Sequence, residues 1–147
     1  MAKGEKMHKT QHFFFNVVKL HRLWTKEFGK RLSGIGMTHG LAAVLLHLEL
    51  LGEGSTQREI AESMEIEQPT LVALVERLEE LALLTRRPYP GDRRKHVLML
   101  TPKGRKLLSQ IADIYESTYQ ALFSCIDGEQ MNQIEQLLAR IYSASKS

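Results

Sequence analysis

Residues 66–101 read IEQPTLVALVERLEELALLTRRPYPGDRRKHVLMLT, and this stretch sets the architecture expected for the whole chain. Its first half predicts an amphipathic helix over residues 69–82, because apolar residues share one side at about 100° per residue. These are Leu71, Leu74, Val75, Leu78 and Leu81. The second half predicts two short strands, residues 83–87 and 96–100, separated by the turn formers of residues 88–92. A helix beside a hairpin with a rather long tip is the expected result.

The segment before this stretch predicts the first helix of a helix-turn-helix unit. Thr56 and Glu59 have the spacing of a capping box, so a short helix is expected to begin at Thr56 and to close near Met64. Pro69 suits the first turn of the following helix, because an N–H at that position would have no partner within the helix. Two helices joined by a turn of a few residues are typical of this DNA-binding motif.

Apolar periodicity predicts further helices on both sides of this unit. One is expected over residues 11–32, after a frayed polar tail at residues 1–9, and a nearly all-apolar central helix over residues 39–51. Two more are expected at the end of the chain, over residues 103–125 and after the capping residue Asp127. The predicted fold class is mainly α with a small β-hairpin wing (α+β), a winged helix-turn-helix.

The apolar face of the first helix is wider than a single core-facing stripe, because phenylalanine occupies positions 13, 14 and 15. This width predicts a second buried contact such as a dimer partner, and a deep core is the alternative. We therefore divide the chain into an N-terminal dimerisation helix (residues 1–35), a winged helix-turn-helix lobe (residues 36–101) and C-terminal dimerisation helices (residues 102–147). A purely structural helical module would explain the two ends of the chain as well.

Charge separates two roles within the central stretch. Residues 66–83 hold four glutamates against one arginine, a formal −3, whereas residues 84–96 hold five basic residues against one aspartate, a formal +4. Phosphate contacts supply most of the affinity for DNA, so the basic hairpin is expected to attract the DNA backbone. The nearly uncharged start of the helix is expected to read bases, with its acidic half pointing away from DNA. A purely structural module gives no reason for the basic cluster.

Candidate contacts to double-stranded DNA come from the two helices and the hairpin. They are Thr56, Gln57, Gln68, Pro69, Thr70, Ala73, Arg77, Arg86, Asp92, Arg93, Arg94 and Lys95. Asp92 lies two positions before Arg94, so its carboxylate is expected to hold that guanidinium in one direction. The alternatives are an ordinary amphipathic surface helix and an exposed, solubilising loop, and the density of basic residues at one hairpin argues against the loop.

Composition narrows the class of protein. The 147 residues are 43% hydrophobic and 25% charged, as in an ordinary globular domain. A run of about 18 apolar residues and an apolar signal segment are both missing, which predicts a cytoplasmic protein without a membrane partner. The sequence contains no nucleotide-binding loop, G-x-S-x-G or H-E-x-x-H motif, so we expect neither an enzyme nor a cofactor.

The central stretch resembles the MarR family of bacterial transcriptional regulators, most closely its SlyA-like branch. The resemblance rests on residues 66–72, on residues 78–81, and on a wing pattern formed by Asp92 and Arg94 with Leu-Thr at positions 100 and 101. It implies a triangular homodimer whose terminal helices interlock and whose two lobes read a pseudo-palindromic operator. SlyA-like proteins commonly place arginine where this chain has Ala73, so the operator preference is expected to differ.

The resemblance also implies a ligand. Members of the family often bind small aromatic or phenolic anions between the dimer helices and the reading lobe, and then release DNA. The residues expected to line such a pocket offer aromatic walls and a cation, and are His12, Phe15, Arg22, Trp24 and His39. The same residues can equally be interpreted as core and surface positions.

Two sensing chemistries are alternatives to a ligand. Cys125, the single cysteine, would serve a redox-sensing regulator of the same fold, but Asp127 lies nearby and no basic residue is adjacent, which favours a packed thiol. Six histidines suggest a metal sensor, but they do not show the close spacing typical of metal ligands. His8 and His12, four residues apart, share a face only if the first helix starts early. We therefore expect no bound metal.

Overall fold

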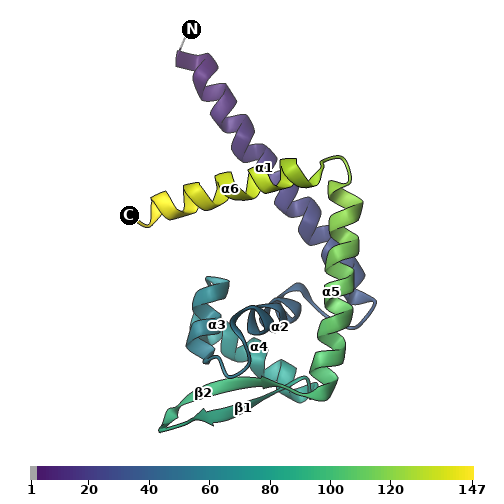
Figure 1. Ribbon diagram of the computed structural model, residues 1–147, viewed down its shortest axis with the longest axis vertical. Helices are drawn as coiled ribbons and strands as arrows, with labels where there is room; N and C mark the ends of the chain where they lie inside the picture. Colours follow the sequence, from purple (N-terminus) through teal and green to yellow (C-terminus); the bar gives the residue numbers. More distant parts are fainter. Residues whose placement is uncertain (1–2) are drawn as a thin grey trace.

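A computed structural model describes residues 3–147, with side chains from His8 onward. The described residues form helices and one two-stranded sheet in the predicted order (Figure 1). The elements are α1 (Lys3–Ser33), α2 (His39–Leu51), α3 (Gln57–Met64), α4 (Gln68–Glu80), β1 (Leu84–Tyr89), β2 (Asp92–Leu100), α5 (Pro102–Phe123) and α6 (Gly128–Ser145). The predicted fold class, mainly α with a small β-hairpin wing, is confirmed.

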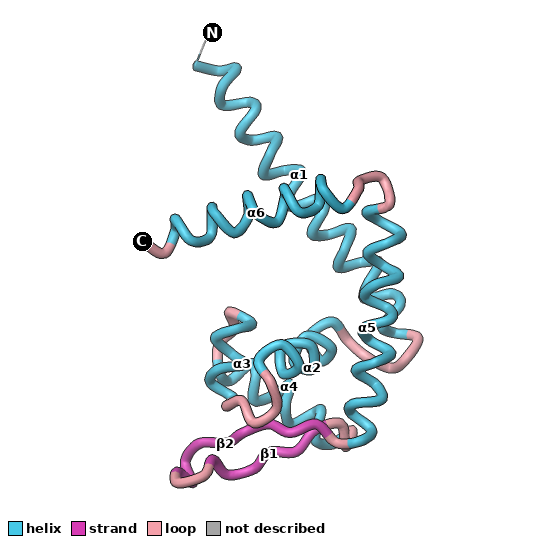
Figure 2. The backbone as a smooth tube through the Cα atoms, in the orientation of Figure 1, coloured by secondary structure: helices cyan, strands magenta, loops and turns pink. Residues whose placement is uncertain are grey.

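The core is centred on α2. Thr38 caps this helix by accepting a hydrogen bond from the backbone N–H of Leu41 (3.3 Å). Because α2 packs against α1, α3, α4 and α5, its residues Leu45 and Leu48 are fully buried. Each buried leucine stabilises the fold by about 1.5 to 3 kcal/mol. Figure 2 shows α2, α3 and α4 gathered on one side of the hairpin, with α5 along the edge of this lobe.

The helices α1 and α6 extend beyond the lobe (Figure 1). The frayed tail predicted at residues 1–9 is wrong from Lys3 onward, where the chain is already helical. Lysine, glutamate and glutamine are good helix formers even without an apolar stripe, which explains the early start. Residues 1 and 2 lie outside the described residues. α6 begins with the predicted cap, a reciprocal box between Asp127 and Gln130, and buries none of its residues.

The hairpin is longer and its tip tighter than the sequence predicts. Pairing runs regularly from Leu84 opposite Leu100 to Pro88 opposite His96, and then shifts so that Tyr89 faces Asp92. The long tip predicted at residues 88–92 is therefore wrong: a two-residue loop closes the turn, with φ of +86° at Gly91. The extra length becomes a bulge in β2, and residues 93–95 stand outside the ladder.

The base of the hairpin is fixed to α5 and to the loop before α3. The backbone N–H of Leu98 donates to the carbonyl of Ser55 (3.0 Å), which joins β2 to that loop. On the other side, the backbone N–H of Thr101 donates to the carbonyl of Leu83 (3.1 Å). Gly104 lies so close to this carbonyl that an added Cβ would be 1.9 Å from its oxygen. These contacts hold the wing in one orientation relative to the helices.

Among the described residues, no helix combines the length and the apolar character needed to cross a membrane.

Candidate nucleic-acid interface and neighbouring cavity

The first turn of α4 presents a polar but uncharged surface. Glu67 is the N-cap residue, and its side chain makes no capping hydrogen bond. Gln68, Pro69, Thr70 and Ala73 are all exposed, whereas the opposite face of the helix packs into the core. The free N–H groups of a helix N-terminus favour anions and hydrogen-bond acceptors. This end of α4 can therefore approach a DNA groove without burying a charge.

Two of the predicted DNA contacts are already paired within the protein. Arg86 Nε lies 2.5 Å from a carboxylate oxygen of Glu79, and the two side chains are 30% and 32% exposed. Arg77 Nη1 lies 2.8 Å from Glu80 on the exposed face of α4. Arg77 and Glu80 have the i, i+3 spacing of neighbours on a helix, but periodicity cannot reveal the pair of Arg86 with Glu79, because it joins β1 to the helix before it. Arg86 thus secures the wing base, and the acidic half of α4 is partly neutralised.

The bulge in β2 leaves three cations available. Arg93, Arg94 and Lys95 are exposed, and none of them takes part in the ion pairs formed among the described residues. Asp92 does not hold the Arg94 guanidinium as predicted; its carboxylate accepts a hydrogen bond from the backbone N–H of Arg94 (2.9 Å). That bond stabilises the backbone of the bulge. The guanidinium remains free to contact a phosphate.

The wing, the start of α3 and the start of α4 surround one hollow of about 420 Å³. It is lined by Thr56, Gln57, Arg58, Glu59, Glu62, Gln68, Tyr89, Arg94, Lys95 and His96. The structure thus brings together Thr56, Gln57, Gln68, Arg94 and Lys95 from the predicted set. Pro69, Thr70, Ala73 and Arg93 are exposed beyond its rim.

Sequence reasoning missed Arg58, Tyr89 and His96. Arg58 directly follows the predicted Gln57, and His96 directly follows Lys95, so extending each predicted segment by one residue would have found both. The Lys95 Nζ lies 5.8 Å from the ring centroid of Tyr89. Tyr89 thus supports a cation at the edge of the hollow.

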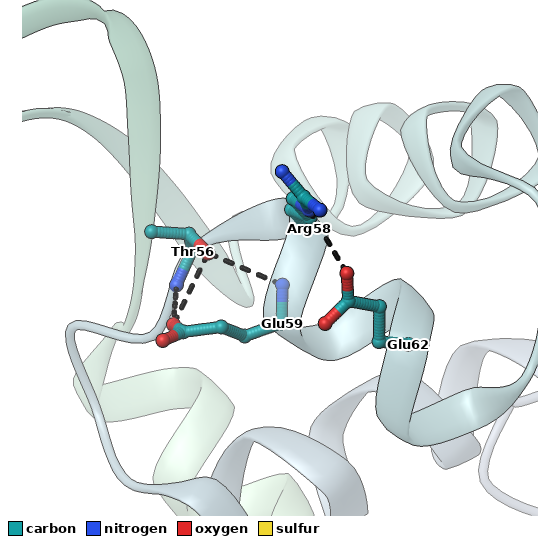
Figure 3. A network of polar contacts seen from close by, with 4 residues as sticks. All are labelled: Thr56, Arg58, Glu59 and Glu62. Carbon is teal, nitrogen blue, oxygen red and sulfur yellow. Dashed lines mark hydrogen bonds and ion pairs between the residues drawn. The ribbon is translucent and has the colours of Figure 1, made fainter.

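The start of α3 is held by a local polar network (Figure 3). The Thr56 hydroxyl accepts a hydrogen bond from the backbone N–H of Glu59 (3.1 Å), and the Glu59 carboxylate accepts one from the backbone N–H of Thr56 (2.7 Å). Arg58 pairs with Glu62 one turn later (2.9 Å), and this hydrogen bond raises the pKa of Arg58. Thr56 therefore serves mainly as a helix cap, and the neighbouring Gln57 carries the available polar group.

A second hollow, of about 610 Å³, lies between α1, α2 and α5. Its lining residues are Trp24, Phe28, His39, Ala43, Leu46, His47, Glu49, Leu50, Ala112, Tyr115 and Glu116. Of the residues predicted for a ligand pocket, Trp24 and His39 line it. His12, Phe15 and Arg22 lie exposed on α1 and do not. No pattern in the sequence predicts the α5 wall, because only the folded chain brings Tyr115 beside Trp24.

Aromatic rings form most of this cavity's wall. The Trp24 ring centroid lies 4.8 Å from that of Tyr115 and 5.6 Å from that of Phe28, whose edge meets His39. Burial lowers the pKa of His39, with a further contribution from the charge of His21. His39 Nε2 is buried and has no hydrogen-bond partner among the described residues. The cavity wall therefore combines aromatic faces with an imidazole whose buried site favours the neutral form.

The residues proposed for redox or metal sensing lie elsewhere. Cys125 follows α5 and is exposed, so the packed thiol favoured by the sequence is wrong. His8 and His12 do share a face of α1, with ring centroids 4.7 Å apart. Within the part of the chain that the structure describes, no three His, Cys, Asp or Glu residues gather as metal ligands would.

The fold and the cationic hollow define a winged helix-turn-helix protein of the DNA-binding class. A model described as MarR family matches residues 35–95. Transcriptional regulator PA3341 is 34% identical over 91% of this chain and 98% of its own, with a TM-score of 0.82. The chain belongs to the MarR family of transcriptional regulators. The SlyA-like branch stays a prediction.

Two further solved structures are similar over most of both chains. CouR from Rhodococcus jostii RHA1 bound to p-coumaroyl-CoA is 26% identical, covering 88% of this chain and 90% of its own, with a TM-score of 0.80. The transcriptional repressor CouR bound to a 23-mer DNA duplex is 26% identical over 97% and 99%, with a TM-score of 0.79. Structures similar to this chain thus include a DNA-bound and a ligand-bound form.

Proposed function

We propose that this protein is a homodimeric transcriptional regulator that binds a pseudo-palindromic operator and releases it when a small aromatic ligand occupies the cavity between α1, α2 and α5. One observation carries the DNA-binding part: Gln68 at the uncharged start of α4 borders the same hollow as Arg94 and Lys95, two wing cations that form no ion pair with a described residue. The DNA complex of CouR supports this assignment by similarity. Regulation, rather than catalysis, is the activity found in the similar proteins.

The proposed DNA contacts divide by chemistry. Gln68, Pro69, Thr70 and Ala73 would face base edges, because they are exposed at the N-terminal end of α4. Contacts to phosphate would come from Gln57, Arg93, Arg94, Lys95 and His96. Arg58, Arg77 and Arg86 are left out because each is paired with a glutamate, and Asp92 acts by shaping the bulge.

The dimer is proposed from apolar surface that a single chain leaves uncovered. Phe14 and Phe15 are 61% and 60% exposed on α1, and Ile141 is 61% exposed on α6. The alternative interpretation, in which a deep core within this chain buries the phenylalanines, is therefore wrong. Exposed apolar patches of this kind mark interaction sites in soluble proteins. Residues 1–35 and 102–147 would thus form the dimer layer, with half-sites about one DNA turn apart.

The proposed ligand site rests on the shape and lining of the cavity. Its volume of about 610 Å³ lies within the range of about 300–1,000 Å³ common for small-molecule sites. The aromatic rings of Trp24, Phe28 and Tyr115 suit a flat apolar ligand. CouR bound to p-coumaroyl-CoA supports ligand binding in a protein of similar fold.

Selection of bound duplexes from a random pool, followed by mobility-shift titration, tests the proposal. We expect an inverted repeat with half-site centres about one helical turn apart. Arg94→Glu should abolish the shift while sedimentation still shows a dimer. Lys106→Glu, the same charge change on the exposed surface of α5, is the control and should bind normally. Absence of any selected duplex at low salt, where phosphate contacts are strongest, would contradict the proposal.

A further inference from the structure

The charges around the aromatic cavity have one sign. Among the described residues that line it, none is a lysine or an arginine, whereas Glu49 from α2 and Glu116 from α5 are both present. Arg22, the cation that the sequence suggested for an anionic ligand, lies exposed on α1 outside the lining. The electrostatic environment of the cavity is therefore negative.

The two carboxylates are available to a ligand. The Glu49 carboxylate has no hydrogen bond or ion pair with another described residue, and the Glu116 carboxylate accepts a hydrogen bond from the neutral amide of Gln120 (2.8 Å). The basic residue of the adjacent hollow, Arg105, does not neutralise Glu49. Both of its contacts from Nη2, at 2.8 and 2.7 Å, go to the carboxylate oxygens of Glu53. A carboxylate ligand in the cavity would meet two like charges.

We propose that the cavity selects an aromatic ligand bearing a protonated amine, rather than an aromatic anion. The ligand ring lies against the wall that Trp24 and Tyr115 form together, and the ammonium group reaches the rim where Glu49 and Glu116 stand. The faces of these rings also attract a cation. This inference rests on the proposed function of the cavity and names the ligand's chemical class.

The test compares three probes that share a phenylethyl group: phenethylamine, phenethyl alcohol and hydrocinnamate. Trp24 is the single tryptophan of the chain and lies in the cavity wall, so its fluorescence reports occupancy directly. A unit charge beside a carboxylate in water changes affinity by about fivefold at contact distance. The two carboxylates attract the ammonium group of phenethylamine and repel the carboxylate of hydrocinnamate. Phenethylamine should therefore bind at least about tenfold more tightly than hydrocinnamate.

Neutral variants identify the source of the preference. Glu49→Gln combined with Glu116→Gln keeps the side-chain shapes and should bring the two charged probes to within about threefold of each other. Asp113→Asn is the control, because it neutralises one carboxylate of α5 at a residue outside the lining. It should retain the cation preference. Equal or tighter binding of hydrocinnamate by the unmodified protein would overturn the proposal, as would no fluorescence response to any probe.

A mobility-shift assay with the same probes separates this inference from the proposed function. If phenethylamine binds preferentially but leaves DNA bound, the ligand class stands and ligand-induced release fails. If hydrocinnamate binds preferentially and releases DNA, the ligand class fails and release stands. Preferential binding and DNA release by phenethylamine support both.

Discussion

Replacing Gly104 by alanine should destabilise this protein, whereas the same replacement at Gly29 should stabilise it. Gly104 is buried in the first turn of α5, where an added Cβ would lie 1.9 Å from the carbonyl oxygen of Leu83. That oxygen already accepts the backbone N–H of Thr101 (3.1 Å), so it is fixed at the base of the wing. Gly29 lies within α1, and a Cβ there would meet nothing within 4 Å.

The magnitudes follow from these two environments. At Gly104 the backbone must move by more than about 1 Å to reach ordinary contact distance, since no flexible side chain can yield. Overpacking lowers the free energy of unfolding by about 1–3 kcal/mol, and the backbone contact at Gly104 places this cost near the upper end. The higher helix propensity of alanine offsets about 1 kcal/mol of that loss. We therefore expect a net loss of about 2 kcal/mol, or about 4–8 °C in Tm. At Gly29 helix preference acts alone, giving a gain of about 0.5–1 kcal/mol.

Both variants can be measured by urea and thermal unfolding followed by far-ultraviolet circular dichroism. Protein concentration must be equal in all samples, because dimerisation would raise apparent stability with concentration. A Gly104→Ala protein as stable as the unmodified chain would refute the close contact between α5 and the wing. A similar loss of stability in Gly29→Ala would show that the effect does not depend on that contact.

Three further outcomes are expected. Arg94→Ala should lower the slope of log affinity for DNA against log salt by about 1, whereas Arg86→Ala should leave the slope unchanged because Glu79 already pairs with it. Leu137→Asp places a charge on the exposed apolar face of α6 and should yield monomers in sedimentation. Burial lowers the pKa of His39, so urea stability should fall as pH drops below the ordinary value of 6.5, and less steeply in His39→Gln.

Helix boundaries were predictable where a local signal sets them. Thr56 and Asp127 each accept a backbone N–H three residues ahead, as the sequence predicts for capping residues, and Thr101 does the same at the start of α5. Capping depends on residues within one turn, so it survives whatever the rest of the chain does. The wing tip was harder to predict, because the position of its bulge depends on pairing between β1 and β2 across the hairpin.

The residues available for binding were less predictable than the elements that carry them. A sequence shows that Arg86 and Arg94 are basic and near one hairpin, but not that Glu79 pairs with one and leaves the other free. The cavity proposed for a ligand shows the same limit. The sequence predicts Trp24 and His39 as lining residues. Tyr115, which lies about ninety positions after Trp24, joins them from α5. Pairing and cavity walls depend on contacts between elements, whereas periodicity describes one element at a time.

The helix that closes the cavity is also the helix that fixes the wing. Tyr115 and Glu116 line the cavity from α5, and Gly104 at the start of the same helix touches Leu83 where the hairpin begins. A ligand can change DNA affinity only if it binds two arrangements of the protein unequally. Because α5 runs unbroken over Pro102–Phe123, a ligand that displaces its cavity wall would also move the base of the wing relative to α4. The proposed ligand response thus needs no change in any residue that touches DNA.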